Sequence, residues 1–445
     1  MLRMCLLSVL LSCLALPTTA ATPLPLGLAS HGTSPNAVGA MTLPALDVGR
    51  LMAEDAVAGP SVPHRIGSSR EVNLDLSTAS RHTALAGGER LWILGVRTPG
   101  ALWQSFVFSL FELPTGVSLY VYSPGGEEVL GPYTSTDNRS FHTLATPVLA
   151  GDEAVIEMDF APGAADASPL RLRTVVGGYR HFAKTEKRAG SCEVDINCPD
   201  GADWQNDKRG VALIYFDGWE CSGTLVNNVR RDCRNYFLTA HHCIDRASYA
   251  QDTVFYWNYE LTGCASGDIA DQTQTGATLR ATYQASDFSL MELAAPPEAD
   301  AHVYYAGWSV STDPAQGAVG IHHPDGDVKK ISIEYNTLMS DGADFWRVPS
   351  WDVGATEPGS SGSGLWNPAH QIVGQLYGGD SACGEPENQM WDDYGKLCVS
   401  WSGGGSTATR LKDWLDPDGT GAATFDGQDA AFCNASPHVR PVELP

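Results

Sequence analysis

The stretch FLTAHHCIDR (residues 237–246) places two adjacent histidines between a strand-like run and a cysteine. A histidine held at the end of a strand, and fixed there by a neighbouring disulfide, is well suited to act as a general base. It must lie within hydrogen-bond reach of a nucleophile, and a third group must set its tautomer. The stretch therefore calls for a serine on a tight turn and a buried acid elsewhere in the chain.

The serine candidates lie in TEPGSSGSGLW (residues 356–366), where glycines bracket three serines. Glycine lets the backbone take a tight conformation that pushes a side chain outward and turns N–H groups inward, as an oxyanion hole requires. Loops rich in glycine and serine are also common as plain turns. This motif alone does not indicate a protease.

The acid candidate is Asp287 in QASDFSLMEL, at the point where a polar turn enters an alternating strand. Taken alone, it fits a turn residue or a cap equally well. The order histidine, aspartate, serine is, however, one of the orders known for catalytic triads. The three motifs together predict nucleophilic catalysis by a serine.

The N-terminus predicts export from the cytoplasm. Residues 1–20 combine Arg3, a short apolar run and small residues near Ala20, which is typical of a cleaved signal peptide. A lipoprotein signal with Cys13 as the acylated residue is the alternative. Without Cys5 and Cys13, nine of the 11 cysteines remain, and all nine lie from Cys192 onward. We therefore expect disulfides only in the C-terminal part, with one cysteine left over.

The formal net charge of −24 argues against a nucleic-acid partner, and there is no basic stripe for anionic lipid. No segment after the signal is long and apolar enough for a membrane span.

Two β-rich blocks are expected. Residues 21–90 are rich in small residues and predict a partly ordered leader with one strand near EVNLDL. Evenly spaced short strands from about residue 90 predict an antiparallel sandwich or barrel. A basic linker, HFAKTEKRAG, precedes the second β-rich block. That block should close with a helix at TATRLKDWLD, capped by Ser406.

Ten short motifs between Cys192 and Asp429 follow one another in register: GTLVNN, YFLTAHHC, YWNY, SDFSLMEL, AGW, IHHP, TEPGSSGS, GQLYGG, DDYGK and SWSGGG. In this order they resemble the secreted bacterial lysyl endopeptidases, a branch of the chymotrypsin-like serine proteases. The preceding block resembles the long propeptide of that family, less specifically. The resemblance implies an all-β protein, with a β-sandwich-like propeptide before a chymotrypsin-like double β-barrel and a C-terminal helix.

The implied domains are a signal peptide (1–20), a propeptide (21–187), a protease domain (188–429) and a short tail (430–445). The resemblance further implies the catalytic roles. His242 would be the base, Asp287 the acid that orients it and Ser361 the nucleophile, while His241 is structural. The N–H groups of Gly359 and Ser361 would form the oxyanion hole.

The same resemblance implies three disulfides, Cys192–Cys383, Cys198–Cys264 and Cys221–Cys243. Cys233, Cys398 and Cys433 have no counterpart in the family pattern. One pair among them is expected, and the sequence does not decide which.

The resemblance also implies how a cationic side chain would be bound. Trypsin-like enzymes usually carry an aspartate six residues before the nucleophile, where this chain has Ala355. Lysyl endopeptidases instead carry an aspartate directly before a YG pair, which implies Asp392 in WDDYGK. Its neighbour Asp393 is the rival.

Tyr377 and Gly378 in GQLYGG are predicted to line the same pocket, with Tyr377 where the family has a histidine. The family stacks a tryptophan on that histidine, and Trp346 is the candidate for this role here. Because these positions depart from the family pattern, cleavage after both lysine and arginine is an alternative to strict lysine specificity.

The resulting hypothesis is a secreted serine endopeptidase that cuts after lysine and processes itself after Lys187. A catalytically idle binding or adhesion protein on a protease fold is the alternative from another class, and the intact triad argues against it. Expected partners are peptides and proteins with lysine at P1 and the chain's own propeptide, and the protein should be a monomer. His322 and His323 lack a third ligand at suitable spacing, so neither a metal nor a cofactor is expected.

Overall fold

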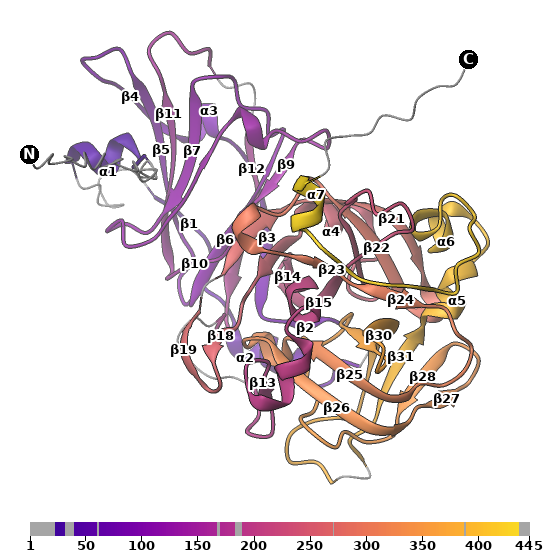
Figure 1. Cartoon of the computed structure of the whole chain (residues 1–445). Helices are drawn as coiled ribbons and strands as arrows, with labels where there is room; N and C mark the ends of the chain where they lie inside the picture. The colour runs from indigo at the N-terminus through magenta and orange to yellow at the C-terminus, as the bar shows by residue number, and fades with distance from the viewer. Residues whose placement is uncertain are drawn as a thin grey trace, which may run out of the picture.

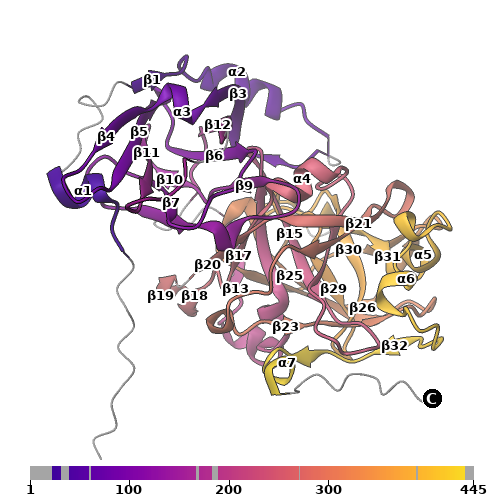
Figure 2. The ribbon, with the colours of Figure 1, turned by 90° about the horizontal axis from the view of Figure 1, so that it is seen from above.

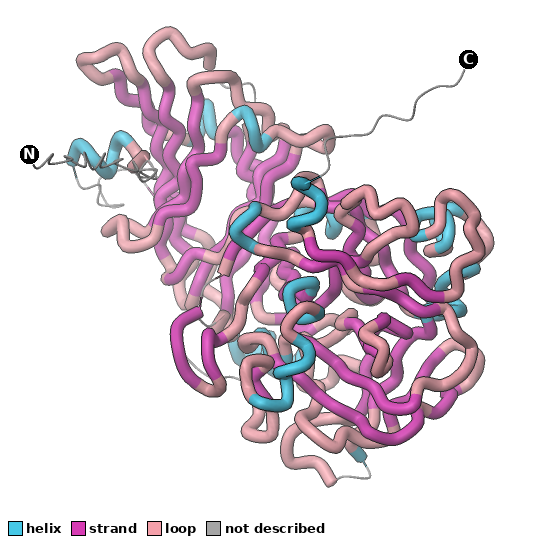
Figure 3. Tube along the Cα trace, viewed as in Figure 1, coloured by secondary structure: helices cyan, strands magenta, loops and turns pink. Residues whose placement is uncertain are grey.

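The computed structural model describes residues 23–31, 40–59, 62–166, 170–182, 189–269, 271–386 and 389–435. They form an N-terminal sandwich and a larger C-terminal domain, which lie side by side (Figures 1 and 2). Strands dominate both parts, and helices occur as short segments (Figure 3). None of the helices in these ranges is long and apolar enough to cross a membrane. The predicted signal peptide and Lys187 lie outside the described residues.

The N-terminal part is a sandwich of two sheets. The first contains, in spatial order, β1 (Ala40–Thr42), β5 (Arg90–Arg97), β11 (Glu153–Phe160), β7 (Val117–Tyr122) and β8 (Val129–Tyr133), with β4 (Arg81–Ala84) paired to β5. The second contains β10 (Leu149–Ala150), β6 (Trp103–Ser109), β12 (Arg171–Gly178) and β3 (Gly67–Asp75), with β9 (Thr143–Ala145) paired to β6. Alternate residues such as Phe106 and Phe108 of β6 and Leu119 and Val121 of β7 fill one core. Because β1, β3 and β4 belong to these sheets, the sandwich begins well before residue 90.

The C-terminal domain has the predicted chymotrypsin-like architecture of two β-barrels. One sheet runs β20 (Gln272–Thr275), β17 (Val254–Trp257), β14 (Val211–Phe216), β15 (Trp219–Val226), β16 (Tyr236–Ala240), β22 (Phe288–Leu293) and β21 (Ala277–Tyr283). The other runs β13 (Val194–Asp195), β26 (Lys330–Thr337), β25 (Gln316–His322), β29 (Gly364–Trp366), β30 (Gln371–Gly379), β31 (Asp392–Lys396), β28 (Phe345–Val348) and β27 (Met339–Asp341). Strands β24 (Gly307–Ser309) and β32 (Thr424–Phe425) extend the second sheet, and two small ribbons pair β18 (Leu261–Gly263) with β19 (Ser266–Ile269) and β23 (Tyr304–Tyr305) with β33 (Gln428–Asp429).

The helices are short. They are α1 (Leu26–His31), α2 (Val48–Asp55), α3 (Leu76–Ala79), α4 (Ala247–Asp252), α5 (Leu397–Ser402), α6 (Lys412–Leu415) and α7 (Ala431–Ala435). The single helix expected at TATRLKDWLD is instead a 3-10 turn, η9 (Thr407–Thr409), followed by α6. Ser406 does cap η9, but Arg410 is extended (φ −147°, ψ 150°) and separates the two turns. Leu411 and Leu415 are nevertheless fully buried.

A separate cluster of buried hydrophobic residues joins the sandwich to the C-terminal domain. Its buried members are Ile66, Trp103, Val107, Ala145 and Val176 from the sandwich and Leu213, Tyr215, Val254, Tyr256, Tyr259 and Val328 from the domain. Hydrogen bonds cross the same boundary, between Ser105 Oγ and the Tyr215 hydroxyl (2.6 Å) and from the Val148 N–H to the Tyr256 hydroxyl (3.0 Å). The short strand β2 (His64–Arg65) also leaves the sandwich and pairs with β15. The described N-terminal region is thus packed firmly on the domain.

Candidate active site

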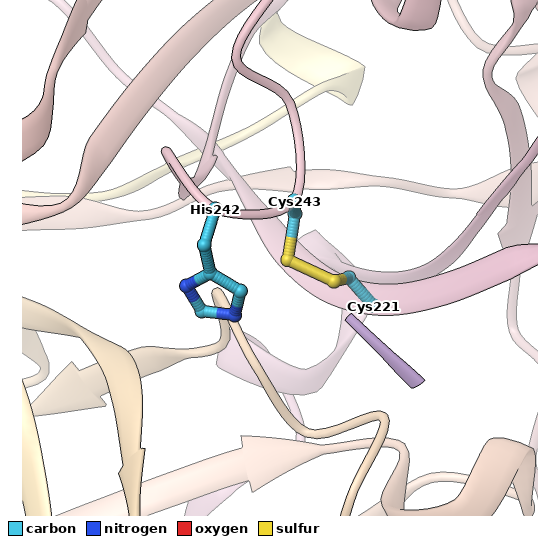
Figure 4. A group of neighbouring side chains, drawn as sticks. All are labelled: Cys221, His242 and Cys243. Atoms are coloured by element: carbon cyan, nitrogen blue, oxygen red, sulfur yellow. A yellow bond between two sulfur atoms is a disulfide. The ribbon is translucent and has the colours of Figure 1, made fainter. Parts of the chain in front are cut away.

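His242 lies in the loop after β16, directly before Cys243. Cys243 is disulfide-bonded to Cys221 on β15, and Figure 4 shows the His242 ring beside this bond. The bond fixes the loop to its neighbouring strand, and a link of this kind stabilises a fold by roughly 2–4 kcal/mol. Because the two sulfur atoms are bonded to each other, this group of three side chains offers no thiolate for a metal ion.

Asp287 contacts His242 through both carboxylate oxygens. Oδ2 lies 2.8 Å from Nδ1 of the ring, and Oδ1 accepts a hydrogen bond from the His242 backbone N–H at 2.9 Å. The residue is 3% exposed and has a left-handed φ of 52°, at the turn between η5 (Gln284–Ser286) and β22. A carboxylate accepts, so the proton belongs on Nδ1 and Nε2 is left as the basic nitrogen. Nε2 is buried and has no hydrogen-bond partner among the described residues.

The main chain beside Asp287 is held by a second layer of contacts. The backbone carbonyl of Asp287 accepts hydrogen bonds from the His241 N–H (2.8 Å) and from Nε2 of Gln375 (3.3 Å). The same Nε2 also donates to the Ser286 carbonyl (2.7 Å). The His241 ring turns away to Thr282 Oγ1, at 2.7 Å. These contacts fix the strained turn from both barrels, because Gln375 lies on β30 and Asp287 at the start of β22.

Only one serine of the glycine-rich loop is accessible. Ser360 and Ser363 are fully buried, whereas Ser361 is partly exposed. The carbonyl of Ser361 accepts a hydrogen bond from the Ser222 N–H on β15 (2.8 Å), and Cys243 Sγ lies 3.9 Å from the same carbonyl oxygen. The serine therefore lies beside the strand and the disulfide that position His242.

Two backbone N–H groups of this loop are available for a ligand. Within the described part of the chain, neither the Gly359 N–H nor the Ser361 N–H donates to a protein acceptor. Gly359 has a φ of 96°, and a Cβ added there would lie 3.0 Å from the His323 carbonyl oxygen. Only glycine fits this position without strain. The pair of free donors is the arrangement expected of an oxyanion hole.

Asp392 is a buried carboxylate at the base of a cavity. It is 1% exposed, and its Oδ2 accepts hydrogen bonds from Trp351 Nε1 (2.6 Å) and Thr356 Oγ1 (2.7 Å). Its Oδ1 is buried and has no partner among the described residues. Burial raises the pKa of Asp392 to about 7. The cavity wall also includes Ser361 and Gly378. One unsatisfied carboxylate oxygen is therefore available to a cationic group.

The neighbouring Asp393 already has a cationic partner. Arg347 donates from Nε to Oδ1 (2.9 Å) and from Nη2 to Oδ2 (2.7 Å). This two-pronged contact neutralises the carboxylate, and Asp393 does not line the cavity that contains Asp392.

Tyr377 contacts the ring of His242 edge-on, with 5.9 Å between ring centroids and an interplanar angle of 87°. Its aromatic neighbour is Phe345, at a centroid distance of 5.2 Å. The suggestion that Trp346 would pack on Tyr377 is wrong. Adjacent strand residues point to opposite faces, and Trp346 is buried on the other face of β28 beneath Lys396 Nζ (4.5 Å).

The two histidines of GIHHP are buried and neutral. His322 Nδ1 lies 2.8 Å from Ser360 Oγ, and its Nε2 lies 2.9 Å from Ser332 Oγ. Burial lowers the pKa of His322 to about 3 and that of His323 well below its usual value. His322 thus anchors the serine loop from behind by hydrogen bonding.

Among its described residues the domain contains four disulfides. Cys192–Cys383, Cys198–Cys264 and Cys221–Cys243 are the pairs implied by the family resemblance. The fourth joins Cys233 to Cys433, which leaves Cys398 as the free thiol. This fourth bond ties α7 to the loop before β16.

Three residues that shape the site were not predicted as site residues. Trp351 and Thr356 hold Asp392, and Gln375 braces Asp287. Each is fixed by contacts between segments far apart in the chain. Thr356 and Gln375 could have been suspected, because they lie in the TEPGSSGS and GQLYGG motifs, whereas Trp351 lies in no motif.

Part of the chain is similar to known proteins. Residues 187–395 match the family "Lysyl endopeptidase, C-terminal domain". A curated protein from Pseudomonas aeruginosa, "Lysyl endopeptidase", is 34% identical over 316 residues, which cover 63% of this chain and 66% of that protein. The chain thus spans slightly less than two thirds of the length of this relative.

Solved structures that match part of the chain include a Glu endopeptidase in complex with MPD, at 16% identity and a TM-score of 0.29. That match covers 47% of this chain and 89% of the other. Another is Kallikrein-related peptidase 10, at 16% identity and a TM-score of 0.32, covering 44% of this chain and 94% of the other.

Proposed function

We propose that this chain, whose residues 187–395 match the lysyl endopeptidase C-terminal domain, is a serine endopeptidase that cleaves on the carboxyl side of lysine. The observation that carries this proposal is Asp392. Its buried Oδ1 has no partner among the described residues, and it lines the same cavity as Ser361. A lysine ammonium in this cavity would satisfy the carboxylate and place the following peptide bond near the serine.

The proposed chemistry is acyl transfer. His242 Nε2 takes the proton of Ser361 Oγ as this oxygen attacks the peptide carbonyl, and the N–H groups of Gly359 and Ser361 stabilise the developing oxyanion. The His242 imidazolium then protonates the leaving amine. Asp287 holds the ring and stabilises its charge through the 2.8 Å contact. Water completes the cycle by attacking the acyl-enzyme with His242 again as the base.

Specificity is proposed to come from the contrast between the two adjacent acids. A lysine ammonium can approach Asp392 Oδ1, whereas the Asp393 carboxylate is occupied by Arg347. Digestion of a denatured protein mixture, with cleavage sites read by mass spectrometry, tests this assignment. Cuts confined to lysine support it. Cuts shared between lysine and arginine would favour the broader trypsin-like alternative, and no cuts by correctly folded protein would contradict a protease function.

We expect a distinct pH dependence from the raised pKa of Asp392, about 7. A carboxyl with a raised pKa is neutral at lower pH, so below about pH 7 an incoming ammonium finds no counter-charge. The kcat/KM for a lysyl peptide, divided by the rate of reaction with an uncharged phosphonate probe, should fall about tenfold from pH 8 to pH 6. Dividing by the probe rate removes any pH dependence of the acylation chemistry itself, so the ratio reports on binding of the lysine side chain. A ratio that stays constant would contradict a role for Asp392 in binding.

We also propose that the protein is a secreted zymogen whose residues up to Lys187 are a propeptide, since four disulfides suit an oxidising compartment. The processing prediction is a cut after Lys187 by the enzyme itself. In a protease-free host the wild type should yield a fragment that begins at Arg188, while Ser361→Ala remains full-length. N-terminal sequencing and gel analysis measure both results. Efficient processing of the serine variant would contradict self-cleavage.

A further inference from the structure

The outer edge of β15 is only partly covered within the C-terminal domain. Strand β16 pairs with Thr224–Val226, and the edge before it is paired with β2 of the N-terminal region instead. The partners are Trp219 with Arg65 and Glu220 with His64, in antiparallel register. Once the N-terminal region leaves, this edge would be free to bind another extended peptide.

The direction of β2 matches that of the leaving-group half of a substrate. The Ser222 N–H holds the Ser361 carbonyl, so Ser222 marks the end of this edge that lies at the nucleophile. From there β2 runs outward, with His64 opposite Glu220 and Arg65 opposite Trp219, and Ile66 then donates to the Gly218 carbonyl (2.9 Å). A substrate chain likewise runs outward from the scissile bond toward its C-terminus.

His64 lies between two carboxylates of the C-terminal domain. Its Nδ1 is 2.7 Å from Glu220 Oε1, and its Nε2 is 3.4 Å from Asp325 Oδ1. The side chain of Glu220 is completely buried, and its Oε2 has no hydrogen-bond partner among the described residues. The two ring nitrogens of His64 therefore face different carboxylates, and the ring occupies the space between them.

Glu220 is close to the reacting centre. Residues two apart on a strand share a face, so the Glu220 side chain points to the same side as that of Ser222. Ser222 Oγ donates to the Gly359 carbonyl of the nucleophile loop (3.0 Å). Two residues of a strand span about 7 Å, which is also the span of two residues in an extended substrate. The cavity that contains Ser361 and Asp392 extends to His64 and Asp325.

We propose that Glu220 and Asp325 form a subsite for a cationic side chain at the second residue after the scissile bond, and that His64 fills this subsite in the precursor. The proposal rests on the proposed function, because it concerns the leaving-group side of the same cleft. Departure of His64 leaves the buried Glu220 carboxylate without its partner, and a substrate guanidinium or ammonium would replace it.

The test compares two peptides that differ only in charge. Both contain one lysine followed by alanine, and the next residue is either arginine or its neutral isostere citrulline. With enzyme obtained by processing of the full chain, kcat/KM for cleavage after lysine should be about tenfold higher for the arginine peptide, because one charge-assisted contact of about 1.4 kcal/mol corresponds to tenfold. If arginine or citrulline is placed instead at the first or third residue after the lysine, the ratio of kcat/KM for the arginine peptide to that for the citrulline peptide should be smaller.

Variants identify the acids responsible. Glu220→Gln should lower the arginine-to-citrulline ratio to about two or less, and Asp325→Asn should lower it partly. The second variant covers the case in which Glu220→Gln does not fold. Asp418→Asn, which removes the same charge from an exposed pair with Arg230, is the matched control and should keep the wild-type ratio.

Two outcomes would overturn the proposal: an arginine-to-citrulline ratio near one in the wild type, or a ratio that Glu220→Gln and Asp325→Asn leave unchanged. Either outcome can be measured only if the enzyme cuts the peptides after lysine. Failure to cut either peptide after lysine is a different result, and it would contradict the proposed function itself.

Discussion

Ser361→Ala should reduce peptidase activity by about 10⁶-fold, the scale found when the nucleophile of a triad is removed. The reason is geometric. Ser360 and Ser363 are fully buried, and Ser360 Oγ is hydrogen-bonded to His322, so neither hydroxyl can replace that of Ser361. The remaining N–H donors of the loop would still give some acceleration over water. Steady-state hydrolysis of a lysyl peptide and labelling by a fluorescent phosphonate measure the loss.

The fold should survive this change, because one partly exposed hydroxyl is removed. Thermal unfolding of Ser361→Ala should therefore resemble that of the uncut wild-type precursor. Ser363→Ala, which removes a buried hydroxyl two residues away, is the matched control and should still be labelled by the phosphonate. If Ser361→Ala keeps its label, or if label moves to Ser360, the nucleophile has been assigned incorrectly.

Asp392→Asn should lower kcat/KM for lysyl peptides by several hundredfold or more. The substitution keeps the size of the side chain and an oxygen that can accept from Trp351 and Thr356. It removes the negative charge that Oδ1 would offer to an ammonium. Loss of one partner of a buried ion pair costs roughly 3–5 kcal/mol, and each 1.36 kcal/mol is about tenfold in rate. Reaction with an uncharged acylating probe should change little, since the triad is intact.

Asp393→Asn is the neighbouring control. Its carboxylate is already paired with Arg347, so the same change one residue away should have little effect on lysyl peptides. A reversed order of the two variants would move the cation-binding role to Asp393. Equal and mild losses would mean that the acids act only through a diffuse field, and the physical basis for lysine specificity would disappear.

Local patterns were sufficient to predict the strands and the loop containing Ser361, because alternating side chains and bracketing glycines depend on near neighbours. Contacts between distant segments were not predictable in this way. Phe345 rather than Trp346 meets Tyr377, since the choice depends on the face that each residue of β28 presents. The pairing of Cys233 with Cys433 depends on where α7 docks.

The segment VPHRIG (residues 62–67) was the structural element least predictable from the sequence. VPHRIG shows no clear periodicity, yet it supplies β2 and the contact of His64 with Glu220. Its order comes from the edge of β15, which lies about 150 residues further along the chain and provides the hydrogen bonds that the segment lacks by itself. A pattern search within a short window cannot detect such a partner.

Each of the four disulfides joins two cysteines at or beyond Cys192, so none of them bonds the sandwich to the domain. In the intact chain the peptide backbone keeps the sandwich next to its docking face, at an effective concentration on the order of millimolar for a short connection. A single cut after Lys187 would turn this contact into an ordinary bimolecular equilibrium. The fraction of enzyme with the N-terminal region still bound would then fall with dilution. The cut enzyme would therefore be inhibited at high local concentration, close to the secreting cell, and active once it has diffused away.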